Sequence, residues 1–168
     1  MVKLSMVHVI ACETSAFWDS FFDEALSRKL FLEGLGFRDW SVVERSEEGP
    51  VLRRTVSVEP TLSLPGPIQK LVGSRFRYTE EGTFDRAAEI FRFKLVPSTL
   101  ADKVRVEGTM TTKPLGKKTE RHVDITVESS VAFVGRLVEE SFAKQLEEGW
   151  KKGADKQNEW LEAEASGR

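Results

Sequence analysis

The sequence predicts an α+β domain in which a curved antiparallel sheet of about seven strands surrounds one long C-terminal helix. Three observations lead to this fold class. The chain has 168 residues, which is the size of one domain. Its middle part holds six segments of alternating apolar and polar residues, joined in pairs by short turns. Its end holds one long amphipathic pattern, and such a helix has to cover one face of the sheet. The predicted element order is β-αα-β6-α.

The first part of the chain predicts a strand followed by a helical segment. Residues 2–10 alternate between two faces, as the residues of a strand do. The face expected to point toward the long helix carries Leu4, Met6, His8 and Ile10. Residues 15–32 carry apolar side chains at helical spacing, which indicates one bent helix or two short ones. Gly34 and Gly36 mark the expected end of this segment.

The six alternating segments predict three successive β-hairpins. They pair residues 37–45 with 50–59, residues 75–85 with 88–96, and residues 103–113 with 119–130. In the last strand Val123 and Ile125 share one face, whereas His122 and Asp124 share the other. Each strand therefore has an apolar and a polar side, which is typical of an antiparallel sheet covered on one face.

Residues 132–163 predict the long helix. One stripe of this helix carries most of its apolar side chains, together with a glutamine and two glycines. The stripe consists of Val134, Val138, Phe142, Gln145, Leu146, Gly149, Gly153 and Trp160. We expect residues 1–163 to form a single domain and residues 164–168 to be a frayed tail.

The residue counts exclude several classes of function. Lys and Arg total 25 against 27 Asp and Glu, so the chain lacks the basic surplus of a nucleic-acid-binding protein. Cys12 is the only cysteine, and only His8 and His122 can supply an imidazole. The sequence therefore predicts no metal site, no cofactor and no catalytic set. No window approaches the ~20 apolar residues of a membrane span, and we expect a cytoplasmic protein.

Two glycines in the long helix are the first candidate functional feature. Gly149 and Gly153 lie four residues apart on the apolar stripe, although glycine inside a helix costs about 1 kcal/mol relative to alanine. The missing side chains permit either close packing of the helix on the sheet or room for a ligand beneath it. The sequence favours the two interpretations equally.

The connection between the first two hairpins is the second candidate. Residues 62–73 are unusually apolar for a loop, and Pro67 is suited to the first turn of a short helix. The segment is interpreted either as a flap that completes the core or as a lid over a pocket that contacts membranes transiently.

Inward-facing polar residues are the third candidate. By alternation His8 points toward the helix, where it is either a hydrogen-bonded core histidine or an anchor for a ligand. Gln145 and Arg121 are further inward polar candidates. The adjacent Arg53 and Arg54 are interpreted as part of a small, solvated basic patch.

The chain resembles START-like proteins of the SRPBCC superfamily, which includes the birch-pollen-allergen-like proteins and has the helix-grip fold. Within it, the chain is similar to a bacterial family of unknown function, best known from actinobacteria. The resembling segments are Leu64–Gly66 with Ile68–Gly73, Val106–Thr109, Val131–Gly135 with Leu137–Glu139, and Trp160–Leu161. The resemblance implies a cavity between the sheet and the C-terminal helix, with lipids, sterols or polyketides among the ligands of the superfamily.

We therefore expect a non-catalytic protein that binds or carries a small hydrophobic ligand, lipid-like or polyketide-like. The expected ligand-binding residues are Met6, His8, Leu64, Ile68, Met110, Val123, Ile125, Phe142, Leu146, Gly149 and Gly153. One alternative is a cyclase- or aromatase-type enzyme with His8 or an inward carboxylate as its general base. The other is a ligand-dependent protein-interaction domain.

Overall fold

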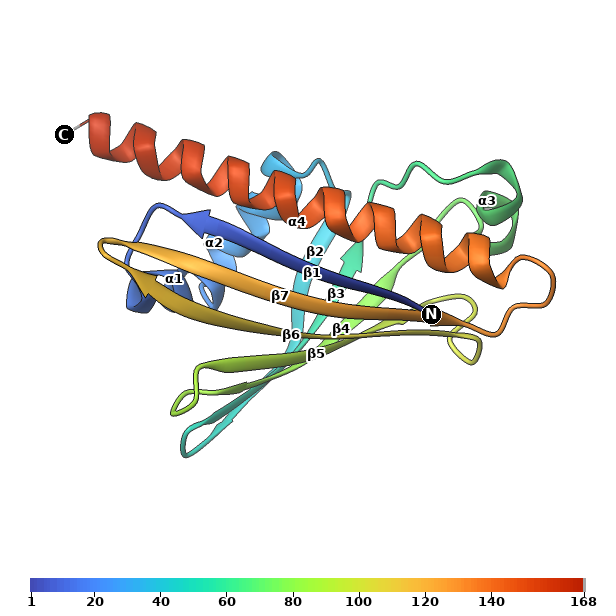
Figure 1. The fold of residues 1–168 in the computed structure, drawn as a ribbon, viewed down its shortest axis with the longest axis horizontal. Helices are drawn as coiled ribbons and strands as arrows, with labels where there is room; N and C mark the ends of the chain where they lie inside the picture. The colour runs from blue at the N-terminus through green and yellow to red at the C-terminus, as the bar shows by residue number, and fades with distance from the viewer. Residues whose placement is uncertain (168) are drawn as a thin grey trace.

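The computed structural model describes residues 1–167 and shows a seven-stranded antiparallel sheet beside one long helix (Figure 1). The strands are β1 (Val2–Ile10), β2 (Asp39–Glu48), β3 (Val51–Glu59), β4 (Tyr78–Asp85), β5 (Ile90–Pro97), β6 (Val104–Leu115) and β7 (Lys118–Ser129). The helical segments are α1 (Thr14–Phe21), α2 (Glu24–Lys29), the π-helical turn η1 (Leu30–Gly34), α3 (Gly66–Val72) and α4 (Gly135–Ser166). The predicted α+β class and element order are confirmed, and α3 is the short helix expected at Pro67.

The sheet is an open meander that the first strand extends at one edge. Strands β2 to β7 pair in sequence order, and β1 pairs with β7, so that β1 and β2 are the two edges. In this register Met6 lies opposite Val123, and His8 lies opposite Arg121. Met6 is buried while Val7 is 56% exposed, which confirms the alternation predicted for the first strand.

Two glycines relieve crowding on the concave face of the sheet. Gly82 and Gly108 lie opposite Phe93 on its two neighbouring strands. A Cβ atom at Gly82 would meet the ring of Phe91 at 2.4 Å, and one at Gly108 would meet the ring of Phe93 at 2.5 Å. Glycines at such positions commonly mark sharp bends of a sheet. Strands β2 and β3 accordingly run steeply across the direction of β1 and β7 (Figure 1).

The N-terminal helical segment consists of two short helices, one of the two predicted forms. The carboxylate of Asp23 accepts a hydrogen bond from the backbone N–H of Leu26 (2.9 Å) and so caps α2. Aromatic side chains of α1 cover the sheet: the ring of Trp18 stacks on Phe84 at 4.4 Å, and the ring of Phe21 lies 5.1 Å from Phe91. This packing fills the concave face in front of β4 and β5.

Helix α4 is anchored to the edge of the sheet near its C-terminal end. The amide of Asn158 accepts a hydrogen bond from the N–H of Ala11 (2.8 Å) and donates one to the carbonyl of Val9 (2.7 Å). The helix continues to Ser166, so residues 164–166 are helical where the sequence predicted a frayed tail. Alanine and glutamate, which dominate these last turns, are strong helix formers. Residue 168 lies outside the described residues.

Residues 62–73 form part of the core. Ile68 is fully buried and Val72 is 3% exposed, both within the main hydrophobic cluster. The hydroxyl of Thr99 donates to the carbonyl of Val72 (3.4 Å), which ties α3 to the loop after β5. The structure thus favours the flap interpretation over the lid, because Ile68 and Val72 of α3 are already covered.

The crowding at Gly108 generates a testable prediction. Gly108→Ala should lower the free energy of unfolding by about 1–3 kcal/mol, because its Cβ would meet both the Phe93 ring and the Asp124 carbonyl, 2.8 Å away. Urea unfolding measures this. Gly66→Ala, with no atom within 4 Å of the added Cβ, is the matched control and should change little. Equal effects of the two substitutions would contradict the steric account.

Candidate functional site

A cavity of about 250 Å³ lies between the concave face of the sheet, the N-terminal helical segment and the part of α4 from Gln145 onward. Most of its lining is apolar and much of it is aromatic. The aromatic lining residues are Phe17, Phe21, Phe31, Phe37, Trp40, Tyr78, Phe93, Trp150 and Trp160. The polar side chains with a formal charge are Arg54, Glu80, Arg121 and Glu164. The site therefore combines apolar walls with a few charged groups, as small-molecule sites do.

The glycine pair of α4 faces this cavity. Gly149 and Gly153 both line it, and a Cβ atom at either position would have no neighbouring atom within 4 Å. Close packing of helix on sheet would instead place atoms at contact distance. Of the two interpretations that the sequence left open, the structure favours room beneath the helix.

The structure brings together three of the eleven expected ligand-binding residues at the cavity. Leu146, Gly149 and Gly153 line it. Six others belong to the concave side of the domain but outside the lining: Met6, His8, Met110, Val123, Ile125 and Phe142. Of these, Met110 and Val123 are fully buried among neighbouring core side chains, so no open space remains beside them.

Leu64 and Ile68 were expected to contact the ligand, but neither lines the cavity. Ile68 belongs to the core cluster that also contains Phe142 of α4, whereas the cavity lies along α4 from Gln145 onward. The amide of Gln145, which does line the cavity, donates to the carbonyl of Ser63 (2.8 Å). This bond brings residues 62–73 only to the margin of the site.

Arg54 is a cavity residue that the sequence analysis missed. Its side chain is 3% exposed, donates to the carbonyl of Phe21 (3.2 Å) and forms an ion pair with Glu80 (3.3 Å). The guanidinium also lies 5.0 Å from the ring centres of Phe21 and Phe22. Alternation along β3 was the signal that could have placed it inside, because Leu52 and Val56 flank it at two-residue spacing.

Tyr78, on β4, lines the cavity on the same face of the strand as Glu80. Burial raises the pKa of Tyr78, and the nearby charge of Glu80 raises it further, so its phenol is neutral at pH 7. A neutral phenol can donate and accept hydrogen bonds. Together with Arg54, these residues form the polar wall of the cavity.

Arg121 and His8 form a second polar group at the cavity. Arg121, 5% exposed, lines the cavity, and its Nη2 donates to Nδ1 of His8 (3.0 Å) and to the carbonyl of Trp150 (3.0 Å). Since an arginine only donates, Nδ1 of His8 accepts and the proton lies on Nε2. Burial, and then the charge of Arg121, lower the pKa of His8. His8 thus faces inward as predicted, yet it touches the cavity only through Arg121.

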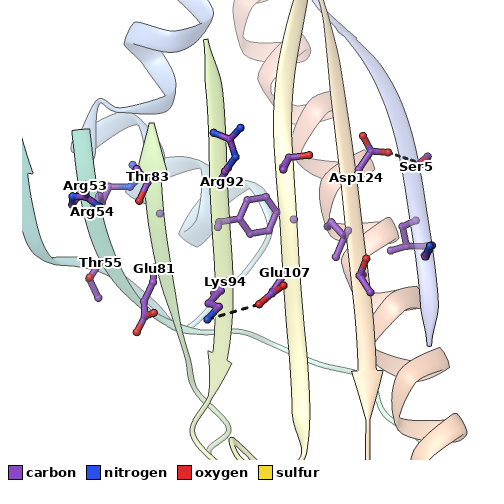
Figure 2. A pocket seen from close by; sticks show the side chains of 18 residues that line it. Ser5, Arg53, Arg54, Thr55, Glu81, Thr83, Arg92, Lys94, Glu107 and Asp124 are labelled. Atoms are coloured by element: carbon purple, nitrogen blue, oxygen red, sulfur yellow. Dashed lines mark hydrogen bonds and ion pairs between the residues drawn. The ribbon is translucent and has the colours of Figure 1, made fainter. Parts of the chain in front are cut away.

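The outer face of the sheet carries a wider hollow of about 790 Å³, lined by polar rows across the strands (Figure 2). Two pairs of these side chains bond one another. Lys94 lies 3.8 Å from Glu107, and the hydroxyl of Ser5 donates to Asp124 (2.6 Å). Such cross-strand pairs are ordinary on a solvated sheet face. Arg53 points to this side and Arg54 to the other, so the two do not form one basic patch.

Residues 1–167 contain neither a cluster of metal ligands nor a helix that could span a membrane. No group of three or more His, Cys, Asp or Glu side chains in this range could hold a metal ion. No helix in the same range is long and apolar enough to cross a membrane.

Comparison with known proteins identifies similar folds. Residues 5–161 match a family described as "Protein of unknown function (DUF2505)". No curated protein sequence is similar to the chain. Among solved structures, TTHA0849 from Thermus thermophilus is 20% identical with a TM-score of 0.68, covering 96% of this chain and 98% of that one.

Two other solved structures are also similar. A START superfamily protein from Mycobacterium smegmatis is 18% identical with a TM-score of 0.62, over 95% of this chain and 98% of that one. The Zhui aromatase/cyclase from Streptomyces sp. R1128 is 9% identical with a TM-score of 0.65, over 93% of both chains. The predicted START-like, helix-grip fold is confirmed by these likenesses.

The buried ion pair generates a prediction. Arg54→Met should lower the free energy of unfolding by about 3 kcal/mol, because it leaves the carboxylate of Glu80 at an apolar cavity without its cation. Arg53→Met, at the neighbouring but exposed position, should stay within about 0.5 kcal/mol of the parent. Chemical denaturation measures both. Similar losses in the two variants would show that the pair is not what stabilises this wall.

The environment of His8 predicts a pH dependence. Its folded pKa lies below the ordinary 6.5, so the unfolded chain takes up the proton first as pH falls. The free energy of unfolding should therefore decrease from pH 6.5 downward until the folded pKa is passed. Urea unfolding on either side of this range measures the effect. His8→Phe should remove this component, whereas His122→Phe should retain it. An unchanged slope in His8→Phe would contradict the assignment.

Proposed function

The chain belongs to the DUF2505 family, whose function is unknown, and we propose that it binds or carries a small hydrophobic ligand in the cavity beneath α4. The observation that carries the proposal is the open space at Gly149 and Gly153 on an otherwise apolar helix stripe. A helix that only had to cover the sheet would gain about 1 kcal/mol from alanine at each position. The open space beneath the two glycines is thus present although the glycines lower the stability of the helix.

The size and walls of the cavity support a small ligand. Its volume of about 250 Å³ lies just below the roughly 300–1,000 Å³ that is usual for small-molecule sites. Aromatic walls such as Phe21 and Trp150 would supply apolar contact, and Tyr78 can hydrogen-bond a hydroxyl or carbonyl group. A lipid-like or polyketide-like molecule has this combination of a large apolar part and few polar groups.

The folds of the similar proteins support binding in general terms. The resemblance to START-like and birch-pollen-allergen-like proteins implies hydrophobic ligands, and the chain shares the fold of such proteins over nearly its whole length. We propose a location in the cytoplasm. The half-exposed Leu71 of α3 is the part of residues 62–73 suited to a transient membrane contact.

An enzymatic function is the second candidate, and one observation favours it. Glu80 is an inward carboxylate at the cavity, paired with Arg54 and close to Tyr78. Such a group could act on a bound substrate as a general acid or base. The Zhui aromatase/cyclase shows that an enzyme can have a similar fold, and the similarity extends to the fold alone. A ligand-dependent interaction with another protein is the third candidate.

Native mass spectrometry of freshly purified protein tests the proposal most directly. A copurified small molecule, released by organic extraction and identified, would support binding. The molecule is then incubated with the protein. Its recovery unchanged would support carriage, whereas its conversion to a product would favour the cyclase-type enzyme. A protein that is free of small molecules and also binds no apolar probe would contradict the proposal.

The glycine pair generates a prediction about binding. Gly149→Leu should weaken the binding of the neutral apolar probe N-phenyl-1-naphthylamine at least about tenfold, because the added side chain fills the cavity. Its fluorescence titration measures this. The free energy of unfolding should change by less than about 1.5 kcal/mol, because the leucine enters open space.

Glu148→Leu is the matched control for this experiment. It adds the same side chain to the adjacent, exposed position of α4. The control should bind the probe like the parent protein. Unfolding of Gly149→Leu would support the close-packing interpretation instead, and unchanged probe binding would move the binding site elsewhere.

A further inference from the structure

Arg121 is a charged side chain placed in the apolar interior without a charged partner among residues 1–167. It lies on the concave face of β7, 5% exposed, and lines the cavity beside Gly149 and Trp150. Its guanidinium lies 4.9 Å from the ring centre of Trp150. Arginine is almost never fully buried unless it is paired.

The hydrogen-bond partners of Arg121 within residues 1–167 are neutral. Nη2 bonds Nδ1 of His8 and the carbonyl of Trp150, each at 3.0 Å, and Nε has no partner although it is buried. Burial lowers the pKa of Arg121 to about 10, so the group is still charged at pH 7. The unused donor and the uncompensated charge thus belong to one side chain, which lines the cavity.

The carboxylates in this part of the fold are engaged elsewhere. Asp155 pairs with Lys151 (2.9 Å), Glu120 bonds His122 (2.7 Å), and Glu80 pairs with Arg54. Glu164 also lines the cavity, but it lies fourteen residues along α4 from Trp150, about 21 Å at 1.5 Å per residue. Within the described part of the chain, Arg54 thus has an internal counter-ion at the cavity and Arg121 does not.

We infer that the ligand of this cavity carries an anionic group, of the carboxylate or sulfonate type, that binds the guanidinium of Arg121. The inference rests on the proposed function and specifies its ligand class as an anionic amphiphile. The apolar remainder of the ligand fills the space beside Gly149 and Gly153, where no side chain blocks access. A bound anion would supply the counter-ion and an acceptor for the free Nε donor.

Two probes that differ in a single charge test this inference. N-phenyl-1-naphthylamine is neutral, and 8-anilinonaphthalene-1-sulfonate is the same ring system with one sulfonate. Their dissociation constants are measured by fluorescence for the full chain and for Arg121→Met. Arg53→Met, which removes an exposed arginine from the opposite, outer face of the sheet, is the matched control.

The expected result is a change in the ratio of the two dissociation constants. Arg121→Met should weaken the binding of the sulfonate relative to that of the neutral probe by about tenfold or more, the effect of one hydrogen bond between charged groups. Arg53→Met should leave the ratio unchanged. A ratio that is the same in all three proteins would overturn the inference and leave hydrophobic binding intact. If neither probe bound the parent chain, the proposed function itself would fail.

An NMR titration of His8 in the parent protein gives a second measurement that needs no variant. The charges that act on His8 are Arg121 and Lys151, which lower its pKa, and Asp155, which raises it. A sulfonate bound to Arg121 would offset the first of these and raise the pKa of His8, whereas the neutral probe would not. The same titration curve with both probes would overturn the inference even if Arg121→Met did not fold.

Discussion

Helix α4 has to cover the concave face of a seven-stranded sheet with one stripe of side chains, and it does so unevenly. In its first half Val138, Phe142 and Ala143 are buried against the core. Further along the helix Gly149 and Gly153 offer no side chain, and the space beneath them is not filled by other elements. The cavity is therefore a property of the spacing along one helix. The other walls, from α1 to η1, from β2 to β5 and from β7, define its outline.

The two arginines of the cavity represent different solutions to the same physical problem. Removing a guanidinium from water is unfavourable unless a counter-ion and hydrogen-bond acceptors replace the water. Arg54 has a carboxylate, a carbonyl and several aromatic rings around it. Arg121 has only a neutral imidazole, a carbonyl and one indole ring from the described part of the chain. Each arginine has a buried Nε without a partner, but only the charge of Arg54 has a counter-ion among the described residues.

The sequence predicted the fold well and the site only in part, for a physical reason. Alternation and turn residues are local signals. They were sufficient to predict the hairpins and the inward orientation of His8 and Arg121. Which inward residues border empty space depends on how distant side chains fill the volume. Val123 and Gly149 share the concave side, yet one is fully enclosed and the other is not. Arg54 was misplaced because its neighbour Arg53 suggested a surface pair, although strand alternation separates them.

The contact of Asn158 with β1 has a consequence for the assembly of the protein. The unpaired backbone groups of an edge strand are a template on which another chain can add a strand. The Asn158 side chain occupies two of these groups, at Val9 and Ala11, in the manner of a short stretch of neighbouring strand. The last turns of α4 therefore protect this edge against aggregation with a second sheet. Loss of these turns would expose the end of β1 to strand addition by another molecule.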